Sequence, residues 1–359
     1  METAATPEYK LFDDPLHYFN AMLEDIENAK EYIYLEMYRV GNDSIGQKFK
    51  EALTKKAKEG LEIELLLDSW GTSLPHSFFK EFESSGGKVT FFKKIRFYFD
   101  FFTKNHRRNH RKLLIIDDKI SYIGSGILTA YSIIWRELML RIKEEELTRI
   151  FKRTFLESHK IYNKYIFNRF AGRKTIFYKE FSIIRDLPSI YRQSIKKKYE
   201  ELISNAKSEV VIETPYFLPG FKLRKVMMEA ASRGVKVSVI VPEHSDVKVA
   251  DLLRCKYLGI LHKNNVNIQF YKPHNLHAKC MMVDKQIFTI GTSNFDYRSF
   301  RYQHEIMLCG EEASIVGKLT SHIAQSLNDS VAFDYKKWLG RPRTQKFFEY
   351  ILIPFRHLL

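Results

Sequence analysis

Apolar residues in this chain gather in short runs of strand length, and two of these runs have similar surroundings. Tyr32–Leu35 follows the segment Ile26–Glu31, and Val210–Ile212 follows the comparable segment Ile203–Ser208. A glutamate ends each run: Glu36 and Glu213. A helical stretch that stops just before a continuous apolar run is typical of a helix that leads into a buried strand.

The same order of segments continues in both halves. The helical stretch Phe49–Lys58 leads to Gly60, and Leu223–Ser232 leads to Gly234, each with an apolar strand soon after. Glycine just beyond a helix is a common stop signal. Strand, helix and strand with short connections predict a βαβ unit. Because several segments recur in one order, we expect an α/β fold of two similar lobes. Each would be a mainly parallel sheet flanked by helices, and pseudo-two-fold symmetry would relate them.

This repeat predicts three parts of the chain. Residues 1–150 would form the first lobe, and residues 194–359 the second lobe with an amphipathic tail. The segment 151–193 is basic, aromatic and rich in helix-forming residues, so we expect a helical linker between the lobes. A helical cap without a function of its own explains this segment equally well.

Composition and charge narrow the class of protein. Of 359 residues, 45% are hydrophobic and 28% are charged, which is typical of a globular protein with room for two domains. The net charge of +15 favours anionic partners such as nucleic acid, acidic lipid or phosphorylated substrates, although a basic surface without a partner would look the same. The three cysteines, Cys255, Cys280 and Cys309, form no CxxC pair. They favour a reducing compartment and predict no zinc site.

No apolar stretch reaches the roughly 20 residues that a membrane span needs, and residues 1–14 do not have the pattern of a signal peptide. We therefore expect a cytoplasmic protein that contacts the inner face of the cell membrane peripherally.

Two copies of one motif carry the chemistry. His110 and Lys112 are followed after four apolar residues by Asp117, and residues 277–284 repeat the pattern with His277, Lys279 and Asp284. Side chains alternate along a strand, so histidine and lysine two residues apart face the same way at its beginning. A turn of small residues follows each copy, at 124–126 and 291–294. One copy alone is a weak signal, but two copies at the same place in a repeat are a strong one.

The pair of motifs suits the cleavage of phosphodiesters. One imidazole attacks phosphorus, and the other protonates the departing oxygen and later deprotonates the incoming alcohol or water. Lys112 and Lys279 would hold the phosphate oxygens, so that this chemistry needs no metal and no cofactor. Neutral donors would come from the residues of the small turns: Ser125, Thr292 and Asn294.

Carboxylates complete the expected site. A histidine used in this way needs a partner that fixes its tautomer, and Glu137 and Glu305 are the glutamates that follow the two motifs. A surface salt bridge is the alternative for each. Asp117 and Asp284 belong to the signatures and count among the candidate catalytic residues. They lie at the far end of the strand from the histidine, so a structural role is at least as well supported.

The two signatures resemble the paired HKD motifs of the phospholipase D superfamily and, within it, bacterial cardiolipin synthases. The resemblance covers nearly the whole chain and is carried by residues 109–117, 213–219, 276–279 and 291–300 and by the tail 353–359. It implies that one phosphatidylglycerol donates its phosphatidyl group to the enzyme through a phosphohistidine and that a second phosphatidylglycerol accepts it. By analogy with the superfamily, the first signature would supply the nucleophile, His110.

Three features depart from that family pattern. Ile127 stands where the family usually has asparagine, so the first half lacks one phosphate donor. Glu137 stands where the family usually has aspartate. The membrane-spanning segments common at the family's N-terminus are not seen, which favours peripheral binding.

Two segments with mixed aromatic and basic character suggest contact with a membrane. In residues 91–104 we expect an exposed loop that binds lipid through five residues: Lys93, Lys94, Arg96, Phe97 and Phe99. The tail, Phe347–Ile353 with Arg356 and His357, is equally compatible with membrane contact and with packing into the core.

The expected partners are therefore an anionic phospholipid, phosphatidylglycerol, and the membrane surface, and nothing indicates an obligate protein partner. A phospholipid hydrolase and a nuclease would use the same histidine chemistry. We favour lipid over nucleic acid because of the interleaved aromatic residues and the tail, although bases also stack on aromatic rings. A binding module without catalysis is disfavoured by the complete histidine and lysine pairs.

Overall fold

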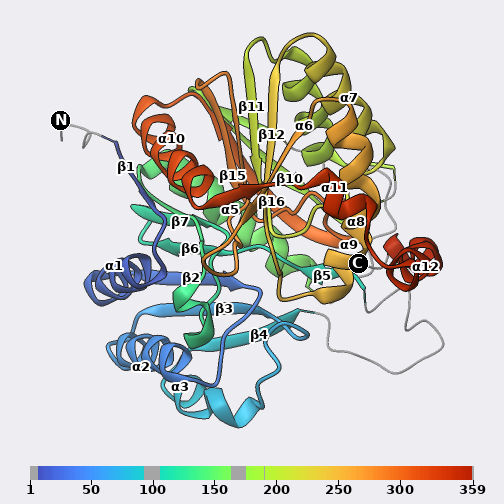
Figure 1. Cartoon of the computed structure of the whole chain (residues 1–359). Helices are drawn as coiled ribbons and strands as arrows, with labels where there is room; N and C mark the ends of the chain where they lie inside the picture. Colours follow the sequence, from blue (N-terminus) through green and yellow to red (C-terminus); the bar gives the residue numbers. More distant parts are fainter. Residues whose placement is uncertain (1–6, 93–105, 163–174, 190, 358–359) are drawn as a thin grey trace. The chain divides into compact units, whose positions relative to one another are not determined.

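The computed structural model of the chain describes residues 7–92, 106–162, 175–189 and 191–357 (Figure 1). The chain divides into two compact units, Met1–Arg173 and Lys174–Leu359. Each unit contains a mixed β-sheet with helices on both of its faces. The chain is therefore an α/β protein with two sheets, as the repeat predicts.

The sheet of the first unit has strands from both ends of the unit. Its spatial order is β1 (Glu8–Phe12), β8 (Met139–Lys143), β7 (Ile120–Gly124), β6 (Leu113–Ile116), β2 (Tyr32–Met37), β3 (Glu62–Asp68) and β4 (Lys88–Phe92). The short strand β5 covers Arg108–Asn109. Strands β2, β3 and β4 run parallel, whereas β6, β7, β8 and β1 follow as antiparallel neighbours.

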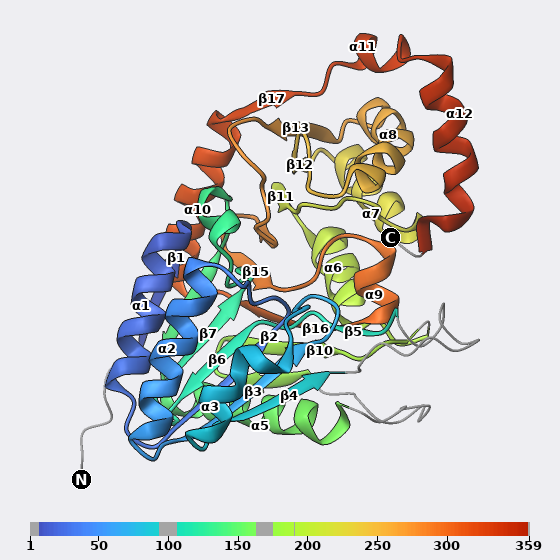
Figure 2. The ribbon, with the colours of Figure 1, turned by 90° about the horizontal axis from the view of Figure 1, so that it is seen from below.

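Helices cover both faces of the first sheet. They are α1 (Pro15–Asn28), α2 (Ser44–Lys58), α3 (Lys80–Ser84) and α5 (Glu145–Ile161), with short 3-10 turns η1 (His76–Phe79) and η2 (Ala130–Ile134). Figure 2 shows α1 and α2 on one face and α5 on the other. Phe19 of α1 and Phe49 of α2 pack into a core with Leu35 and Leu65 of the sheet. On the opposite face, the ring of Phe155 in α5 stacks on Tyr34, with centroids 4.9 Å apart.

The sheet of the second unit has the same arrangement, with an additional strand at each edge, β17 and β9. The order given next starts from the edge beside the parallel strands. It runs β17 (Ser330–Ala332), β13 (Asn267–Tyr271), β12 (Lys236–Pro242), β11 (Glu209–Glu213), β14 (Cys280–Val283), β15 (Ile287–Gly291), β16 (Gln303–Gly310), β10 (Phe181–Asp186) and β9 (Ile176–Tyr178). Here β11, β12 and β13 are the parallel strands, and β14, β15 and β16 are the antiparallel ones.

The helices of the second unit also form two layers. They are α6 (Ser194–Asn205), α7 (Phe221–Ser232), α8 (Lys248–Lys263), α9 (Tyr297–Tyr302), α10 (Ala313–Asn328), α11 (Tyr335–Leu339) and α12 (Arg343–Leu352), with the turn η3 (Ile353–His357). The main core lies between the sheet and α6, α7 and α8, and α10 covers the opposite face of the sheet (Figure 1). The residues of this main core include Ile203, Met227 and Leu258.

Local chemistry explains where the repeated elements begin and end. Asp43 caps α2 by accepting hydrogen bonds from the N–H groups of Ile45 and Gly46, both over 3.1 Å. Gly60 and Gly234 adopt φ of +90° just after α2 and α7, a conformation that favours glycine. The predicted helix stops, and the strands that include Tyr32–Leu35 and Val210–Ile212, are confirmed.

The expectation of mainly parallel sheets was wrong. In each sheet only three strands of the βαβ part are parallel, and the signature strand starts an antiparallel meander. The hairpins that make this meander turn at Asp117-Asp118 and Asp284-Lys285, and all four residues have positive φ. Such turns usually contain a glycine, as in Asn-Gly or Asp-Gly, and neither of these turns has one, so the sequence did not mark the hairpins.

The segment 151–193 is not a purely helical linker. Residues 151–161 belong to α5, which packs on the first sheet, and residues 176–186 include β9 and β10 of the second sheet. The strand β10 pairs antiparallel with β16 from Ser182 to Asp186. The apolar residues of β10 are interrupted by Ser182 and followed by Arg185 and Asp186, so the sequence did not mark this segment as a strand.

Candidate active site

The two signatures occupy equivalent places in the two units. In each unit the histidine and lysine come just before the first antiparallel strand, β6 or β14. Leu113, the first residue of β6, pairs with Glu36 near the end of β2. Cys280, the first residue of β14, pairs with Glu213 at the end of β11. Each signature therefore lies at the carboxyl ends of the parallel strands, where α/β sheets place their ligand sites.

Each signature lysine donates a hydrogen bond to the main chain of the histidine in the same signature. Lys112 Nζ donates a hydrogen bond to the carbonyl oxygen of His110 over 2.7 Å. Lys279 Nζ donates to the carbonyl oxygen of His277, also over 2.7 Å. All four residues are buried, with exposed fractions of 6% or less. The contact uses one of the three ammonium N–H donors and ties the lysine charge to the main chain of the histidine.

A tyrosine lies beside the first signature. The ring of Tyr38, two residues after Glu36, meets the His110 ring edge-on, with centroids 4.8 Å apart. Lys112 Nζ lies 5.3 Å from the centroid of the same ring. Tyr38 thus packs on both signature side chains in the first unit. Sequence reasoning missed it because the residue is more than 70 positions before the signature.

Ser125 and Glu137 are joined by a hydrogen bond. Ser125 Oγ donates to Glu137 Oε2, and it accepts from the main-chain N–H of Leu138 over 2.9 Å. Both side chains are buried. This pairing differs from the expectation that the Ser125 hydroxyl donates to phosphate, because a hydroxyl has a single proton to donate.

Thr292 and Glu305 repeat the arrangement in the second unit. Thr292 Oγ1 donates to Glu305 Oε2 and accepts from the N–H of Ile306 over 3.0 Å. Glu305 and Thr292 are both fully buried. The expectation that the Thr292 hydroxyl donates to phosphate therefore meets the same difficulty. In both units the hydroxyl orients a buried glutamate.

Further acidic groups surround Glu305. Asp186 lies opposite Glu305 in the β10–β16 pairing, and Asp296 caps α9 by accepting from Ser299 N over 2.6 Å. Burial raises the pKa of Asp186 to about 6 and that of Asp296 to about 7, and the negative charge of Glu305 adds to both shifts. The second unit thus has two carboxyl groups of raised pKa near Glu305.

The amide position differs between the two units. Asn294 is buried, and its Oδ1 has no hydrogen-bond partner among the described residues. In the first unit the apolar Ile127 is buried in the corresponding turn. An amide is therefore available in only one of these two turns.

Residues ahead of the first signature form a buried polar support. Arg108 Nε lies 3.0 Å from Asp68 Oδ2, and neither side chain is exposed. The same carboxylate accepts from the main-chain N–H of Asn109 over 2.8 Å, and Asn109 Nδ2 donates to Glu36 Oε1 over 2.7 Å. These bonds fix the backbone just before His110. The partners lie far apart in the sequence, so no spacing signalled them.

Known proteins place this chain in a family. Residues 22–159 and 199–327 match the family described as cardiolipin synthase, PLD-like domain. The chain belongs to this family. Each matched region contains one His-x-Lys signature, so the cardiolipin synthase, PLD-like domain corresponds to the duplicated unit of the fold.

Curated relatives that are named cardiolipin synthase match this chain over most of their length. The chain is similar to the major cardiolipin synthase ClsA of Bacillus subtilis, with 32% identity over 90% of this chain and 70% of that protein. It is also similar to the cardiolipin synthases of Oceanobacillus iheyensis (31% identity, 91% and 70%) and Listeria monocytogenes serotype 4a (31% identity, 95% and 73%).

Solved structures share the fold of this cardiolipin synthase-like chain at low identity. Phosphatidylserine synthase of Haemophilus influenzae matches with a TM-score of 0.75 at 13% identity, over 98% of this chain and 95% of that chain. Polyphosphate kinase of Porphyromonas gingivalis matches with a TM-score of 0.65 at 12% identity, over 99% of this chain and 54% of that chain. Both likenesses concern the fold alone.

The signature aspartate of the first unit of this cardiolipin synthase-like chain binds main chain. Asp117 accepts hydrogen bonds from the N–H groups of Lys30, Glu31 and Tyr32, over 2.6 to 2.9 Å. It lies just beyond the four-residue strand β6, which spans roughly 13 Å at about 3.3 Å per residue, whereas His110 lies before the start of that strand. The carboxylate thereby ties the end of β6 to the start of β2.

Asp284 has the same position in the second unit. Burial acts to raise its pKa, but hydrogen bonds from the N–H groups of Glu209, Lys207 and Ser208 outweigh burial and lower the pKa to about 2. The Ser208 hydroxyl also donates to it, over 2.9 Å. These contacts match the structural alternative for both signature aspartates.

The expected lipid-binding residues are only partly described. The residues expected in the first membrane segment lie outside the described part of the chain: Lys93, Lys94, Arg96, Phe97 and Phe99. In the tail, four apolar side chains of α12 are between 44% and 74% exposed: Phe347, Phe348, Tyr350 and Ile351. They therefore do not pack into the core. Within the described residues, no helix combines the length and apolar character needed to cross a membrane.

Proposed function

We propose that this chain is a phosphatidyltransferase of the cardiolipin synthase type, which joins two phosphatidylglycerol molecules and releases glycerol. The observation that carries the proposal is the repeated local site. A buried histidine, a lysine bonded to its carbonyl oxygen and a hydroxyl-oriented glutamate occur twice in a member of the cardiolipin synthase family. His110 and His277 would act on one phosphate.

In the first step the imidazole of His110 attacks phosphorus of the first phosphatidylglycerol. The bond from phosphorus to the headgroup glycerol oxygen breaks, and His277 as imidazolium gives its proton to that oxygen. Glycerol leaves, and a phosphatidyl-histidine remains. Lys112 and Lys279 offset the negative charge that builds on the non-bridging oxygens, and their buried positions strengthen this interaction.

In the second step the neutral His277 accepts the proton of a glycerol hydroxyl of the second phosphatidylglycerol. The hydroxyl oxygen attacks phosphorus, the bond to His110 breaks, and cardiolipin forms. Water in place of the alcohol would yield phosphatidic acid. The difference between transfer and hydrolysis therefore depends on which nucleophile reaches the intermediate.

Four residues position the reacting groups rather than touching phosphate. Glu137 and Glu305 would fix the tautomers of the two histidines, as carboxylates do for catalytic imidazoles. Ser125 and Thr292 hold these carboxylates by the hydrogen bonds described above. We assign Asp117 and Asp284 to strand ends on the basis of their main-chain contacts, and Asn294 remains the proposed neutral donor to phosphate.

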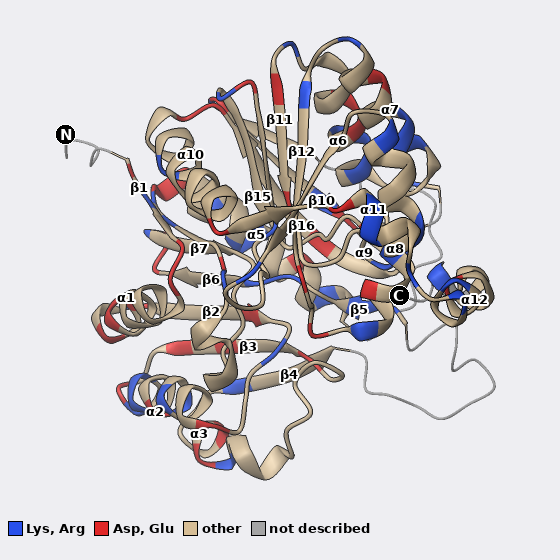
Figure 3. Ribbon diagram, in the orientation of Figure 1, with Lys and Arg blue, Asp and Glu red and all other residues tan. Residues whose placement is uncertain are grey.

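The chain would reach its substrate by binding peripherally to the inner face of the cell membrane. On α12, exposed Phe347 and Phe348 adjoin the exposed Lys346. Figure 3 shows lysine and arginine along α11 and α12. Aromatic rings suit the headgroup region, and cations suit acidic phospholipids. The segment with Lys93, Lys94 and Arg96 would add a second contact of the same kind.

Product analysis tests the proposed reaction. Purified protein is incubated with phosphatidylglycerol vesicles, and the lipids are identified by mass spectrometry. Cardiolipin and glycerol support transfer, and phosphatidic acid indicates a hydrolase. Unchanged lipid, together with cleavage of DNA or RNA in a parallel incubation, indicates a nuclease. His110→Ala and His277→Ala should each abolish turnover. His17→Ala, which alters an exposed histidine in the first unit, is the matched control and should keep it.

A further inference from the structure

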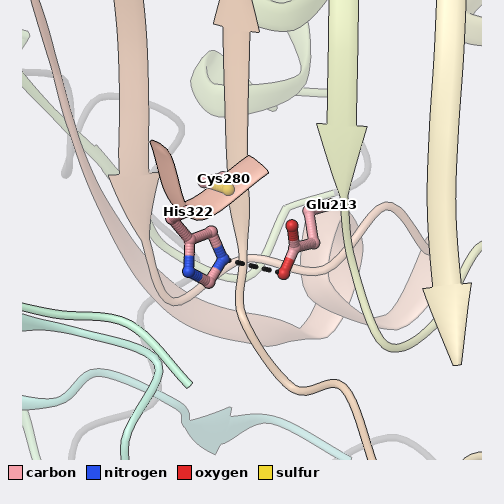
Figure 4. Close-up of side chains that lie close together, drawn as sticks. All are labelled: Glu213, Cys280 and His322. Atoms are coloured by element: carbon pink, nitrogen blue, oxygen red, sulfur yellow. Dashed lines mark hydrogen bonds and ion pairs between the residues drawn. The ribbon is translucent and has the colours of Figure 1, made fainter. Parts of the chain in front are cut away.

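Three side chains that can ligate transition metals lie together in the second unit (Figure 4). Glu213 ends β11, Cys280 begins β14, and His322 lies on α10. One ligand atom of each lies within 4.8 Å of the other two, and His322 Nε2 is 2.9 Å from Glu213 Oε1. Their exposed fractions are 1% or less. The proposed reaction uses none of the three.

The carboxylate of Glu213 has an unsatisfied side. Its Oε1 meets His322, whereas its buried Oε2 has no hydrogen-bond partner among the described residues. A buried carboxylate oxygen without a donor is unfavourable and calls for an explanation, and an unseen ion is one of the recognised ones. A cation bound by both carboxylate oxygens would satisfy it.

The first unit supplies an internal comparison. Glu36 occupies in β2 the place that Glu213 has in β11, but it pairs with Leu113, whereas Glu213 pairs with Cys280. Asn109 Nδ2 donates to Glu36 over 2.7 Å. The first unit therefore has an apolar residue and an amide around its glutamate, where the second has a thiol and an imidazole.

The helices α5 and α10 show the same difference between the two units. Counting from the equivalent helix caps Glu144 and Glu312, His322 of α10 corresponds to Thr154 of α5. Thr154 Oγ1 bonds to the carbonyl oxygen of Ile150 in its own helix. Both potential metal ligands that join the glutamate are thus specific to the second unit, although the two units share one architecture.

We propose that Glu213, Cys280 and His322 bind one Zn²⁺ ion that ties α10 to β11 and β14. The Cys280 thiol would lose its proton to solvent and bind as thiolate, and His322 would bind through the lone pair of Nε2. Sulfur and imidazole nitrogen together favour zinc over magnesium or calcium. Cys280 lies opposite Glu213 in the β11–β14 pairing, so both side chains are on the sheet face that α10 covers. With both Glu213 oxygens, the thiolate and the imidazole as four donor atoms, the ion would be structural.

The test uses cobalt, which replaces zinc in such sites and is visible when bound to thiolate. The full chain is produced in cells grown with Co²⁺, so that the buried site is loaded as the chain folds. Weakly bound metal is then removed with a mild chelator. We expect about one cobalt per chain and a thiolate-to-cobalt charge-transfer band. Zinc-grown protein should contain the same amount of zinc by elemental analysis.

The comparison with the first unit supplies the variants. Cys280→Leu and His322→Thr introduce the residues that the first unit carries, and each should lose the metal and lower the melting temperature. Cys255→Ser changes a half-buried cysteine outside the cluster and should keep both the metal and the band. The circular dichroism spectrum shows whether each variant is folded.

Two results would overturn the proposal, and the first needs no variant. Folded wild-type protein that contains neither cobalt nor zinc after growth in either metal shows that the cluster is a buried hydrogen-bonded pair with a neighbouring thiol. A charge-transfer band that persists in Cys280→Leu or disappears in Cys255→Ser assigns the metal to another site. Neither result depends on whether the chain transfers phosphatidyl groups.

Discussion

Lys112 Nζ donates a hydrogen bond to the carbonyl oxygen of His110, the residue two positions earlier, over 2.7 Å. The second unit repeats the contact at the same length. Because the acceptor belongs to the main chain, the position of the positive charge is set by the backbone of the signature itself. The spacing of two residues thus places the ammonium within hydrogen-bond distance of the histidine carbonyl oxygen in both units.

Removing either signature lysine should slow turnover without unfolding the chain. Lys112→Met and Lys279→Met keep the length of the side chain but lose its charge and its donors. We expect kcat for phosphatidylglycerol to fall by about 10²–10³-fold, which is the usual effect of removing one donor to a developing negative charge. Lys119→Met alters an exposed lysine and is the control. Near-normal kcat in both signature variants would remove the lysines from the mechanism.

The hydroxyl of Ser125 should act through Glu137. Loss of a hydrogen bond to a charged group costs about 1.5–3 kcal/mol, so we expect Ser125→Ala to lower kcat by about tenfold or more. Ser125→Thr, which introduces the residue of the second unit, should restore it. In a double-mutant cycle, Ser125→Ala combined with Glu137→Gln should lose no more activity than Glu137→Gln alone. Multiplying losses would instead mean that the hydroxyl binds phosphate directly.

The βαβ segments and the signatures could be predicted from the sequence because they rest on local patterns. Gly60 and Gly234 mark helix ends by their conformational freedom, and the apolar runs before Glu36 and Glu213 are strands. The hairpin turn at Asp117 was not predictable in this way. Its left-handed conformation is stabilised by hydrogen bonds from residues 30–32, which lie more than 80 positions earlier.

The polar groups around the site show the same division. The histidines and lysines follow from the spacing of the motif, whereas the partners of the hydroxyls depend on strand pairing. Glu305 reaches Thr292 only because β15 and β16 run antiparallel. His322 reaches Glu213 through the packing of α10 on the sheet, across 109 positions of sequence. Such contacts cannot be predicted from the spacing of residues within a local motif.

Two aspartates of the second unit should affect stability with opposite pH dependence. Burial raises the pKa of Asp296 to about 7, against about 4 in an unfolded chain. The folded state therefore binds more protons, and this group's contribution to stability falls as pH rises from about 4 to 7. Asparagine also caps helices, so the Asp296→Asn variant keeps a cap that does not titrate. The melting temperature of this variant should rise relative to that of the wild type as pH increases over that range.

Asp284 supplies the contrasting variant in the same experiment. Its pKa is lowered to about 2, so its contribution is present above about pH 4 and is lost as pH falls toward 2. Asp284→Asn should be less stable than wild type near neutral pH, and the difference should shrink below about pH 4. Parallel pH profiles for the two variants would contradict these assignments. Thermal unfolding followed by circular dichroism provides the measurement.

The exposed face of α12 should strengthen binding to vesicles. Burying a phenylalanine side chain contributes about 1.5–3 kcal/mol, so Phe347→Ser with Phe348→Ser should weaken partitioning by about tenfold or more. Binding of the wild type should rise with phosphatidylglycerol content and fall with salt, because salt screens the basic side chains. Phe177→Ser changes a phenylalanine that is 78% exposed on β9 and serves as the control. An equal loss in this control would mean that α12 has no special role.

The covalent intermediate should form on His110. The analogy with the superfamily assigns the nucleophile to the first signature, and in this unit the Tyr38 ring packs against the imidazole. His277 is then the general acid that protonates the departing oxygen and later the base that accepts the proton of the incoming alcohol.

Trapping decides between the two histidines. The enzyme is quenched within the first turnovers on a labelled phosphatidyl donor with an activated leaving group, and the adduct is located by peptide mass spectrometry. His277→Ala should still accumulate adduct on His110, because an activated leaving group departs without an acid. His110→Ala should accumulate none, because it lacks the attacking nitrogen. An adduct on His277 that persists in His110→Ala would reverse the assignment, and full turnover in both variants would exclude a phosphohistidine.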